Sequence, residues 1–219
     1  MTAGLIRADW PAPPGIVAGT TLRDAETGLP GVQHWLKQVH GATVVRWDDE
    51  QHDLGRPEAD AIVASGYEQC CAVRTADCLP ILFCAADGAE VAAAHGGWRG
   101  LAAGIVESTL GAMSSGPADL IVWLGPAISQ PAFEVGDEVR EAFCATSEEA
   151  EAAFEHNDRG RWQADLFLLA RQRLHRAGVE AIYGGGLCTY SDAERFYSYR
   201  RDGETGRLLS FVCRIMANP

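Results

Sequence analysis

Two histidines and one cysteine stand where expected strands give way to turns. His40 comes just before the apolar run 42–47, Cys78 separates two apolar runs, and His95 ends the run 90–95. A folded sheet can bring together strand ends that are far apart in the sequence. Imidazole and thiolate are zinc ligands, and three protein ligands leave a fourth tetrahedral position for water or substrate. The three residues are therefore candidates for a catalytic zinc site, in which the metal would deprotonate Cys78 and acidify its bound water.

Each of these residues also has a structural interpretation. A histidine at a strand end is commonly a hydrogen-bonded structural residue, and a cysteine between apolar runs is commonly a small core residue. The chain contains neither a CxxC pair nor an HExxH motif, which are the local patterns that favour a metal. Spacing alone therefore leaves both interpretations open.

The residues that follow His95 favour a functional role for this histidine over a structural one. Gly96 and Gly97 allow a sharp turn and a close approach of substrate to the backbone. The helix expected from about residue 100 would present free N–H groups to an anion, and Arg99 lies near that end. Arg99 is therefore a candidate phosphate-binding residue.

The elements that must position these residues alternate between short apolar runs and helical patterns. Several runs are apolar throughout, as in strands that are covered on both faces. We expect strands at 42–47, 59–64, 70–75, 80–86, 90–95, 120–125, 180–185 and 208–215, and helices at 100–113, 135–145 and 164–178. Asp165 and Gly178 stand where the cap and the stop of the last helix are expected. The pattern predicts a single α/β domain, α+β in its element order, with a mixed sheet flanked by helices.

Two polar segments lie in the second half of the chain. Residues 147–161 are expected to form a short helix and a loop. Residues 197–207 are expected to form a strand, a tight turn at Asp202-Gly203 and a returning strand. Arg200 and Arg201, in this second segment, are available to an anion.

Composition limits the partners of the chain. Its 219 residues carry a net charge of −12, which argues against a nucleic-acid partner, because nucleic acids bind to a basic face. A small anionic substrate remains compatible, since it needs only one or two arginines. Neither an apolar segment of the ~20 residues that cross a bilayer nor a secretory pattern is present. We therefore expect no membrane partner, a cytoplasmic location and seven free cysteine thiols. Without GxGxxG or a P-loop, dinucleotide binding and P-loop binding have no support.

Five motifs together resemble the YfiH/PgeF family, also called laccase-domain proteins, whose human relative is FAMIN. They are KQVHG, TADCLPILFC, EVAAAHGGWRG, WLGPAIS with AFEVGDEV, and CTYSDAERFYSYRRDGETGR. They occur in the family's order from about residue 31 to the C-terminus. The resemblance implies a single YfiH-like domain over residues 1–219.

The resemblance also implies a zinc enzyme whose His-Cys-His ligands fall on His40, Cys78 and His95. Family members are described as purine nucleoside phosphorylases with further adenosine deaminase and methylthioadenosine phosphorylase activities. Adenosine, inosine or methylthioadenosine with phosphate are therefore the expected substrates, and Cys78 is counted among the catalytic residues. Asp77 is a candidate for acid–base catalysis or for a hydrogen bond that supports the site, with turn capping as the structural alternative. A monomer or a small homo-oligomer is expected.

The N-terminal part is shorter than the family pattern. Members usually carry an STR element and a later SLNLG-like loop, whereas here GTTLRDAETGLPG leads almost directly into VQHWLKQVHG. Arg23, in TLR, matches the family arginine and is a candidate phosphate-binding residue. The SLNLG loop has no counterpart, which implies a more open site and a different substrate preference.

Two other functions use the same three residues. The family's older name is polyphenol oxidase, and a His-Cys-His set can bind copper, at least in vitro. The chain has only six histidines, no HxH pair and three methionines, which disfavours a multicopper laccase. An amidase that edits peptidoglycan precursors would use Cys78 as nucleophile, or a zinc-activated water.

Overall fold

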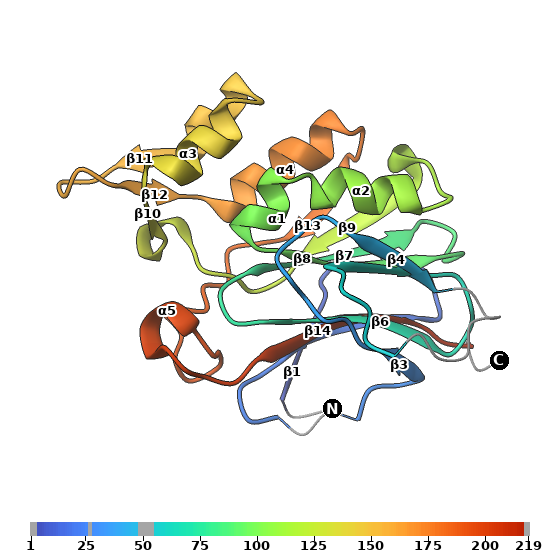
Figure 1. The fold of residues 1–219 in the computed structure, drawn as a ribbon. Coiled ribbons are helices and arrows are strands. Elements are labelled where there is room, and N and C mark those ends of the chain that lie inside the picture. The colour runs from blue at the N-terminus through green and yellow to red at the C-terminus, as the bar shows by residue number, and fades with distance from the viewer. Residues whose placement is uncertain (1–3, 26–27, 48–54, 217–219) are drawn as a thin grey trace.

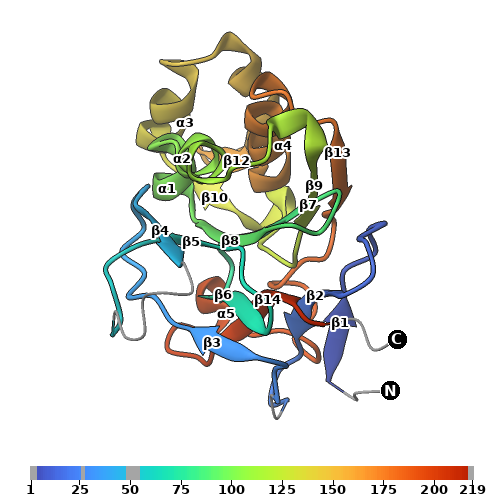
Figure 2. The same cartoon turned by 90° about the vertical axis from the view of Figure 1, so that its right-hand side faces the viewer.

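The computed structural model describes residues 4–25, 28–47 and 55–216. A six-stranded sheet lies at its centre, with helices against one face and a five-stranded sheet against the other (Figures 1 and 2). The mixed α/β architecture predicted from the sequence is confirmed. Its strands divide, however, between two large sheets and a small three-stranded one rather than forming a single mixed sheet.

The two large sheets are mixed. The five-stranded sheet consists, in spatial order, of β1 (Leu5–Arg7), β2 (Ile16–Thr21), β14 (Leu208–Arg214), β6 (Gln69–Thr75) and β3 (Val32–His34). The six-stranded sheet consists of β13 (Ala181–Gly184), β9 (Leu120–Leu124), β7 (Leu79–Ala85), β8 (Val91–Gly96), β5 (Ala61–Ala64) and β4 (Val44–Trp47). The pairs β3–β6, β4–β5 and β9–β13 are parallel, and the other pairs are antiparallel.

Central strands are buried on both faces, as their uninterrupted apolar sequences predict. Every residue of β7 and β8 is buried. Alternate side chains of these strands enter two different cores, one beneath the helices and one between the sheets. The small side chains of three consecutive alanines in β8 allow residues of both cores to pack close to the backbone of this strand.

Helices α1 (Trp98–Ala102), α2 (Ile105–Ala112) and α4 (Leu166–Arg176) cover the outer face of the six-stranded sheet (Figure 1). The expected helix 100–113 is two helices, because Gly104 adopts the left-handed conformation (φ 93°) between them. Asp165 caps α4 as predicted, its side chain accepting a hydrogen bond from the Leu168 amide. Gly178, just after α4, has φ 94°.

The remaining elements form the ends of the molecule. They are α3 (Asp137–Cys144), the 3-10 turns η1 (Pro117–Asp119), η2 (Gln130–Ala132) and η3 (Glu148–Ala153), the small sheet of β10 (Glu134–Val135), β12 (Trp162–Ala164) and β11 (Phe154–His156), and α5 (Tyr199–Asp202). Among the described residues, no helix is long and apolar enough to cross a membrane.

The expected strand, turn and return at residues 197–207 is wrong. The segment forms the single helical turn α5, because the Ser198 side chain accepts a hydrogen bond from the Arg201 amide and caps that turn. Gly203 then ends it with φ 70°.

Cysteine pairing also differs from expectation. Cys70 and Cys213 form a disulfide, so the expectation of seven free thiols is wrong for this pair. The reason is the antiparallel register of β6 and β14, which sets the two residues directly opposite each other. Cys71 points to the other face of β6, into the core between the sheets. The free cysteines are Cys71, Cys78, Cys84, Cys144 and Cys188.

Candidate metal centre

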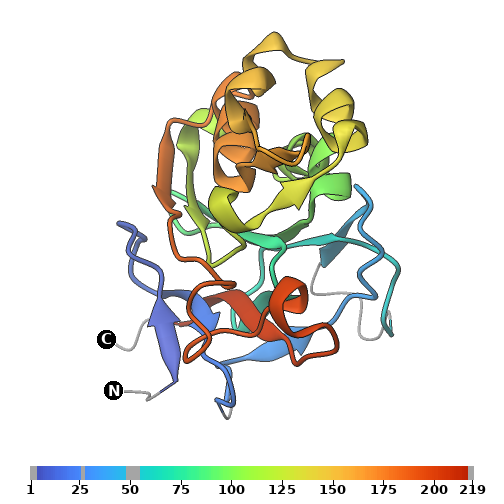
Figure 3. The same ribbon diagram turned by 90° about the vertical axis from the view of Figure 1, so that its left-hand side faces the viewer.

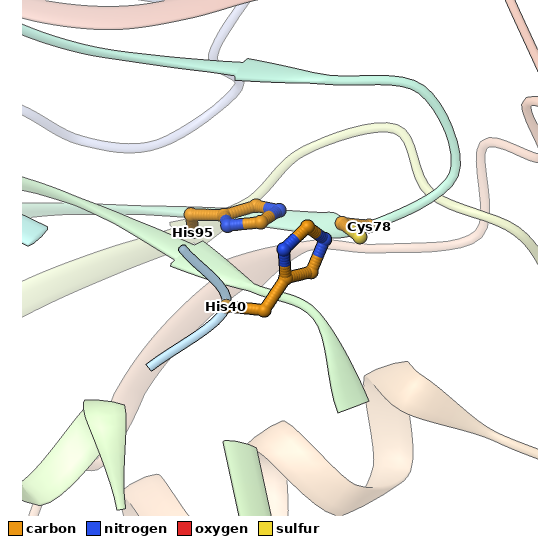
Figure 4. Close-up of side chains that lie close together, drawn as sticks. All are labelled: His40, Cys78 and His95. Atoms are coloured by element: carbon orange, nitrogen blue, oxygen red, sulfur yellow. The ribbon is translucent and has the colours of Figure 1, made fainter. Parts of the chain in front are cut away.

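The three ligand candidates come from places where the chain leaves a sheet. Cys78 lies where the chain passes from β6 of one large sheet to β7 of the other, and His40 lies on the passage from β3 to β4. His95 is at the end of β8. Figure 4 shows the three side chains close together, and one ring nitrogen of each histidine and the Cys78 sulfur all lie within 4.8 Å of one another. The structure thus brings together residues that are far apart in the sequence.

A buried carboxylate orients His95. The imidazole is only 3% exposed, and its Nδ1 lies 2.8 Å from Oδ1 of Asp60, which is completely buried. Because an ionised carboxylate only accepts hydrogen bonds, Nδ1 carries the proton and donates it. The Nε2 atom is therefore the one that faces the other ligand candidates, and it becomes free to bind a metal when the imidazole loses its second proton.

The same carboxylate shapes the loop that carries His40. Asp60 accepts hydrogen bonds from the backbone amides of Val39 (3.2 Å), His40 (2.9 Å) and Gly41 (2.7 Å). His40 has φ 62°, a left-handed conformation that costs energy for a residue with a Cβ. The three hydrogen bonds hold that conformation, so Asp60 positions two of the three ligand candidates.

Sequence analysis did not single out Asp60. The expected strand 59–64 includes Asp60, but a single aspartate near a strand end is ordinarily a turn residue and gives no sign of a role in the site. Burial opposes its ionisation, but hydrogen bonds from His95 and from the Gly41 and Val39 amides outweigh burial and lower the pKa of Asp60.

Two glycines leave the space that the cluster occupies. A Cβ on Gly97 would lie 3.1 Å from both the Cys78 Sγ and the His40 Cδ2 atoms. A Cβ on Gly100 would lie 2.9 Å from the Gly41 carbonyl oxygen, which belongs to the His40 loop. The glycines that follow His95 therefore permit α1 to pack closely against the other two ligand candidates.

Cys78 and His95 shift each other's pKa across the cluster. Burial raises the pKa of the Cys78 thiol, but hydrogen bonds with His40 and His95 outweigh it and lower that pKa to about 6. Burial lowers the pKa of His95, yet its contacts with Asp60 and Cys78 raise that pKa to about 9. Near pH 7 the metal-free site therefore holds a thiolate beside an imidazolium.

Asp77 ties the Cys78 segment to the C-terminal part of the chain. Its Oδ1 accepts a hydrogen bond from the Thr189 hydroxyl (2.7 Å) and its Oδ2 accepts one from the Arg200 amide (2.7 Å). Its φ is 88°, a strained conformation that these contacts hold. Both carboxylate oxygens thus have protein partners, which favours a positioning role over direct proton transfer.

The cluster opens into a cavity of about 1020 Å³. Trp98, Phe133 and Tyr199 provide aromatic walls. Cationic side chains outnumber the carboxylates of Asp77 and Glu204 and are contributed by Lys37, Arg56, Arg74, Arg99, Arg200 and Arg207. In a chain of net charge −12, this cavity concentrates positive charge.

The two arginines predicted to bind phosphate lie in different places. Arg99 lines the cavity, with its guanidinium 4.4 Å from the centre of the Trp98 ring. Arg23 does not line it: its guanidinium lies 3.9 Å from Asp202 and stacks on Tyr197. Arg200 was a candidate for binding an anion in the sequence. In the structure it lines the cavity beside Asp77. Figure 3 views the molecule from the side on which α5, with Arg200, lies.

The donor set fits a metal ion. Two imidazoles and a thiolate are ligands that zinc and copper both accept. The Asp60–His95 hydrogen bond is the outer-shell contact that metal-binding histidines ordinarily have. Their role as ligands nevertheless stays a prediction from the sequence.

Comparison with known proteins places these features in a family. The family model described as "Multi-copper polyphenol oxidoreductase laccase" matches residues 17–215. "Purine nucleoside phosphorylase YfiH" of Escherichia coli is 51% identical over 189 residues, covering 86% of this chain and 76% of that protein. "Purine nucleoside phosphorylase" of Xylella fastidiosa (strain Temecula1) is 42% identical over 246 aligned positions, covering 94% and 95%. Because those positions exceed the 219 residues here, that relative has residues without a counterpart in this chain.

Solved structures show the same fold. A Neisseria meningitidis protein of the DUF152 family superposes with a TM-score of 0.91 at 39% identity, covering 97% of this chain and 100% of that one. YlmD of Geobacillus stearothermophilus superposes with a TM-score of 0.88 at 27% identity, covering 98% and 97%. The chain therefore belongs to the YfiH/PgeF family of laccase-domain proteins.

Proposed function

We propose that the chain is a zinc-dependent purine nucleoside phosphorylase that cleaves adenosine, inosine or methylthioadenosine with phosphate. The observation that carries this proposal is a His-Cys-His cluster that opens into a cavity with aromatic walls and an excess of arginine. Relatives at 51% and 42% identity bear the name purine nucleoside phosphorylase. The reaction joins a phosphate oxygen to C1′ of the ribose as the bond from C1′ to the purine breaks.

Orthophosphate has two arginine partners beside the cluster. Arg99 follows Gly97 in the first turn of α1, and Arg200 is joined through its amide to Asp77, the neighbour of Cys78. Guanidinium groups bind phosphate through paired charge-assisted hydrogen bonds. These two side chains would hold phosphate close to the three ligand candidates and orient it for attack on C1′.

Aromatic side chains would hold the purine. Phe133 is buried, Trp98 is half-buried and Tyr199, on α5, is 61% exposed, and all three line the cavity. Purine bases stack on aromatic rings through their flat π-faces, with little dependence on the base. This wall is compatible with both adenine and hypoxanthine as the base.

His40, Cys78 and His95 would hold zinc, with Asp60 fixing the orientation of His95 and the backbone of His40. Bound there, zinc would act as a Lewis acid for the reacting oxygens and would keep Cys78 as a thiolate. The same site would support adenosine deamination as a second activity.

Copper-dependent polyphenol oxidation is the second candidate, and the description of the matching family model is the observation that favours it. A blue-copper site would add a weak axial ligand, commonly methionine. Met113 is buried in the core beneath the helices and Met216 is 65% exposed, and neither lines the cavity. An amidase that uses the activated Cys78 thiolate is the third candidate, favoured by the lowered pKa of that thiol.

A product assay separates these functions. Metal-analysed protein is incubated with adenosine, with and without phosphate, and the products are separated by chromatography. Adenine and ribose 1-phosphate that form only with phosphate support the proposal, and inosine formed without phosphate reveals the deaminase. Cys78→Ala should abolish both activities, and Cys144→Ala, on the far end of α3, serves as the matched control.

The metal that the protein binds decides what a negative result means. If zinc is bound one per chain and neither product forms, the nucleoside function is wrong. Copper with phenol oxidation would support the second candidate. Activity on a peptidoglycan precursor that is lost on thiol alkylation without any metal would support the third.

A further inference from the structure

The arginines of the cavity differ from those elsewhere in the described part of the chain. Of the twelve arginines outside the cavity, at least eight form ion pairs with carboxylates, for example Arg140 with Glu151 (2.8 Å) and Arg173 with Glu107 (2.7 Å). The five cavity arginines form no ion pair with a described residue. They are Arg56, Arg74, Arg99, Arg200 and Arg207.

This pattern points to an anionic ligand larger than orthophosphate. A protein with 30 acidic residues and 18 basic ones has ample carboxylates to pair with arginine. Leaving five guanidinium groups around one cavity costs mutual repulsion that a bound anion would relieve. One phosphate group is ordinarily satisfied by a pair of arginines, so three of the five remain without a role in the proposed phosphorolysis.

Two of those three arginines lie at the same end of two neighbouring central strands of the five-stranded sheet. Arg74 is near the end of β6, and Arg207 comes just before β14, which pairs with β6 through Leu208 and Thr75. The backbone of Arg74 exchanges hydrogen bonds with the Gln38 side chain (2.8 and 2.9 Å), two residues before His40. These strand ends are therefore joined to the loop that carries His40, and they line the cavity at a different place from α1 and α5.

Cavity size agrees with a larger ligand. Pockets for small organic ligands have volumes of roughly 300–1,000 Å³, and this one is about 1020 Å³. Among the described residues, two carboxylates line it, and both oxygens of Asp77 are engaged in hydrogen bonds. Glu204 therefore leaves most of the positive charge uncompensated.

We propose that the cavity binds a nucleoside that carries a phosphate group of its own, of the nucleoside 5′-monophosphate class, together with orthophosphate. The inference rests on the proposed function. The 5′ position is the end of the ribose that lies away from the bond to the base, so a phosphate there leaves C1′ accessible. Arg74 and Arg207, with Arg56, hold that phosphate, while Arg99 and Arg200 hold orthophosphate.

Equilibrium binding tests this inference without requiring turnover. Calorimetric titrations use the Cys78→Ala variant, in which turnover is expected to be abolished, and measure the Kd of adenosine and of adenosine 5′-monophosphate, each with and without saturating orthophosphate. We expect the monophosphate to bind roughly tenfold to hundredfold more tightly than adenosine, as hydrogen bonds to charged groups contribute to affinity. This advantage should persist with orthophosphate present, because the two anions occupy different arginines.

A double variant, Arg74→Gln with Arg207→Gln, removes two charge-assisted contacts to the 5′-phosphate. It should therefore reduce the preference for the monophosphate over adenosine to less than roughly threefold. Both side chains are exposed, so folding is retained and is checked by the melting temperature. Arg161→Gln removes one exposed arginine that lines no cavity and should leave the advantage unchanged.

Equal affinities for adenosine and its monophosphate would overturn the inference. So would an advantage that orthophosphate abolishes, since the cavity would then hold a single phosphate site. Phosphate-dependent release of adenine from adenosine is measured on the native protein. That assay reports on the proposed function separately, so the failure of one proposal is distinguishable from the failure of the other.

Discussion

Replacing Asp60 with asparagine tests how the cluster is held together. In the native protein Oδ1 accepts from His95 and from the His40 amide, and Oδ2 accepts from the amides of Val39 and Gly41. An asparagine of the same shape keeps one acceptor oxygen, and its NH₂ group faces two donors. Two charge-assisted hydrogen bonds are therefore lost.

The expected cost follows from those contacts. Each hydrogen bond to a charged group contributes about 1.5–3 kcal/mol, so the variant should lose about 3 kcal/mol of unfolding free energy even at the lower bound. The imidazole of His95 would also lose the carboxylate that fixes its tautomer, which lowers metal affinity roughly tenfold to hundredfold. Denaturant unfolding of metal-free protein gives the first quantity, and competition with a zinc chelator gives the second.

A matched control distinguishes orientation of the ligands from general damage. Glu90 is another buried carboxylate, and it accepts hydrogen bonds from Arg46 and from the Ser115 amide at the opposite end of β8. Glu90→Gln should destabilise the fold without changing zinc affinity. The reasoning is refuted if Asp60→Asn keeps zinc affinity within twofold of the native value, or if Glu90→Gln lowers affinity to the same degree.

Three further predictions concern the cysteines and one glycine. In metal-free protein, alkylation of Cys78, followed by peptide mass spectrometry, should rise with pH about a midpoint near 6, because the lowered pKa makes the thiolate the major form above that pH; a midpoint above pH 8 would contradict it. Gly97→Ala should weaken zinc binding at least roughly tenfold, since its Cβ would crowd the Cys78 sulfur at 3.1 Å, and a chelator titration that shows native affinity would contradict this. Unreduced, denatured protein should show five reactive thiols, because Cys70 and Cys213 are joined; seven reactive thiols before reduction would contradict the disulfide.

Sequence patterns predicted the strands and helices that can be identified from neighbouring residues alone. The apolar runs that became β5, β7, β8 and β9 are long enough to mark buried strands, and their ends agree with the structure to within about two residues. Asp165 marked the start of α4 in the same way, because its cap is a local hydrogen bond. These features depend on near neighbours in the chain.

Features that depend on distant contacts could not be predicted. Division of the strands between two large sheets requires crossings near His40 and Cys78, and a run of apolar residues does not say which sheet it joins. Short strands such as Leu5–Arg7 carry too few residues for a period. The turn α5 forms because Ser198 caps it. Ser198 is one of several polar residues in this arginine-rich segment, so its role as a cap was not evident from the sequence.

The site shows the same limit. His40, Cys78 and His95 were candidates from their residue types, and the family motifs made the set specific. Asp60 was missed, because its importance lies in contacts with a loop twenty residues away and with a histidine thirty-five residues away. The cavity arginines were missed in part for the same reason, since four separate segments contribute them.

Zinc titration of metal-free protein tests whether the His-Cys-His cluster is the catalytic centre. Adenine release from adenosine, in the presence of phosphate, is measured as zinc is added in fractions of an equivalent. The account predicts no release without metal, a linear rise and a plateau at one zinc per chain, with no response in the Cys78→Ala variant. Adenine release that is independent of metal, or that survives in that variant, would contradict the assignment of this cluster as the catalytic centre.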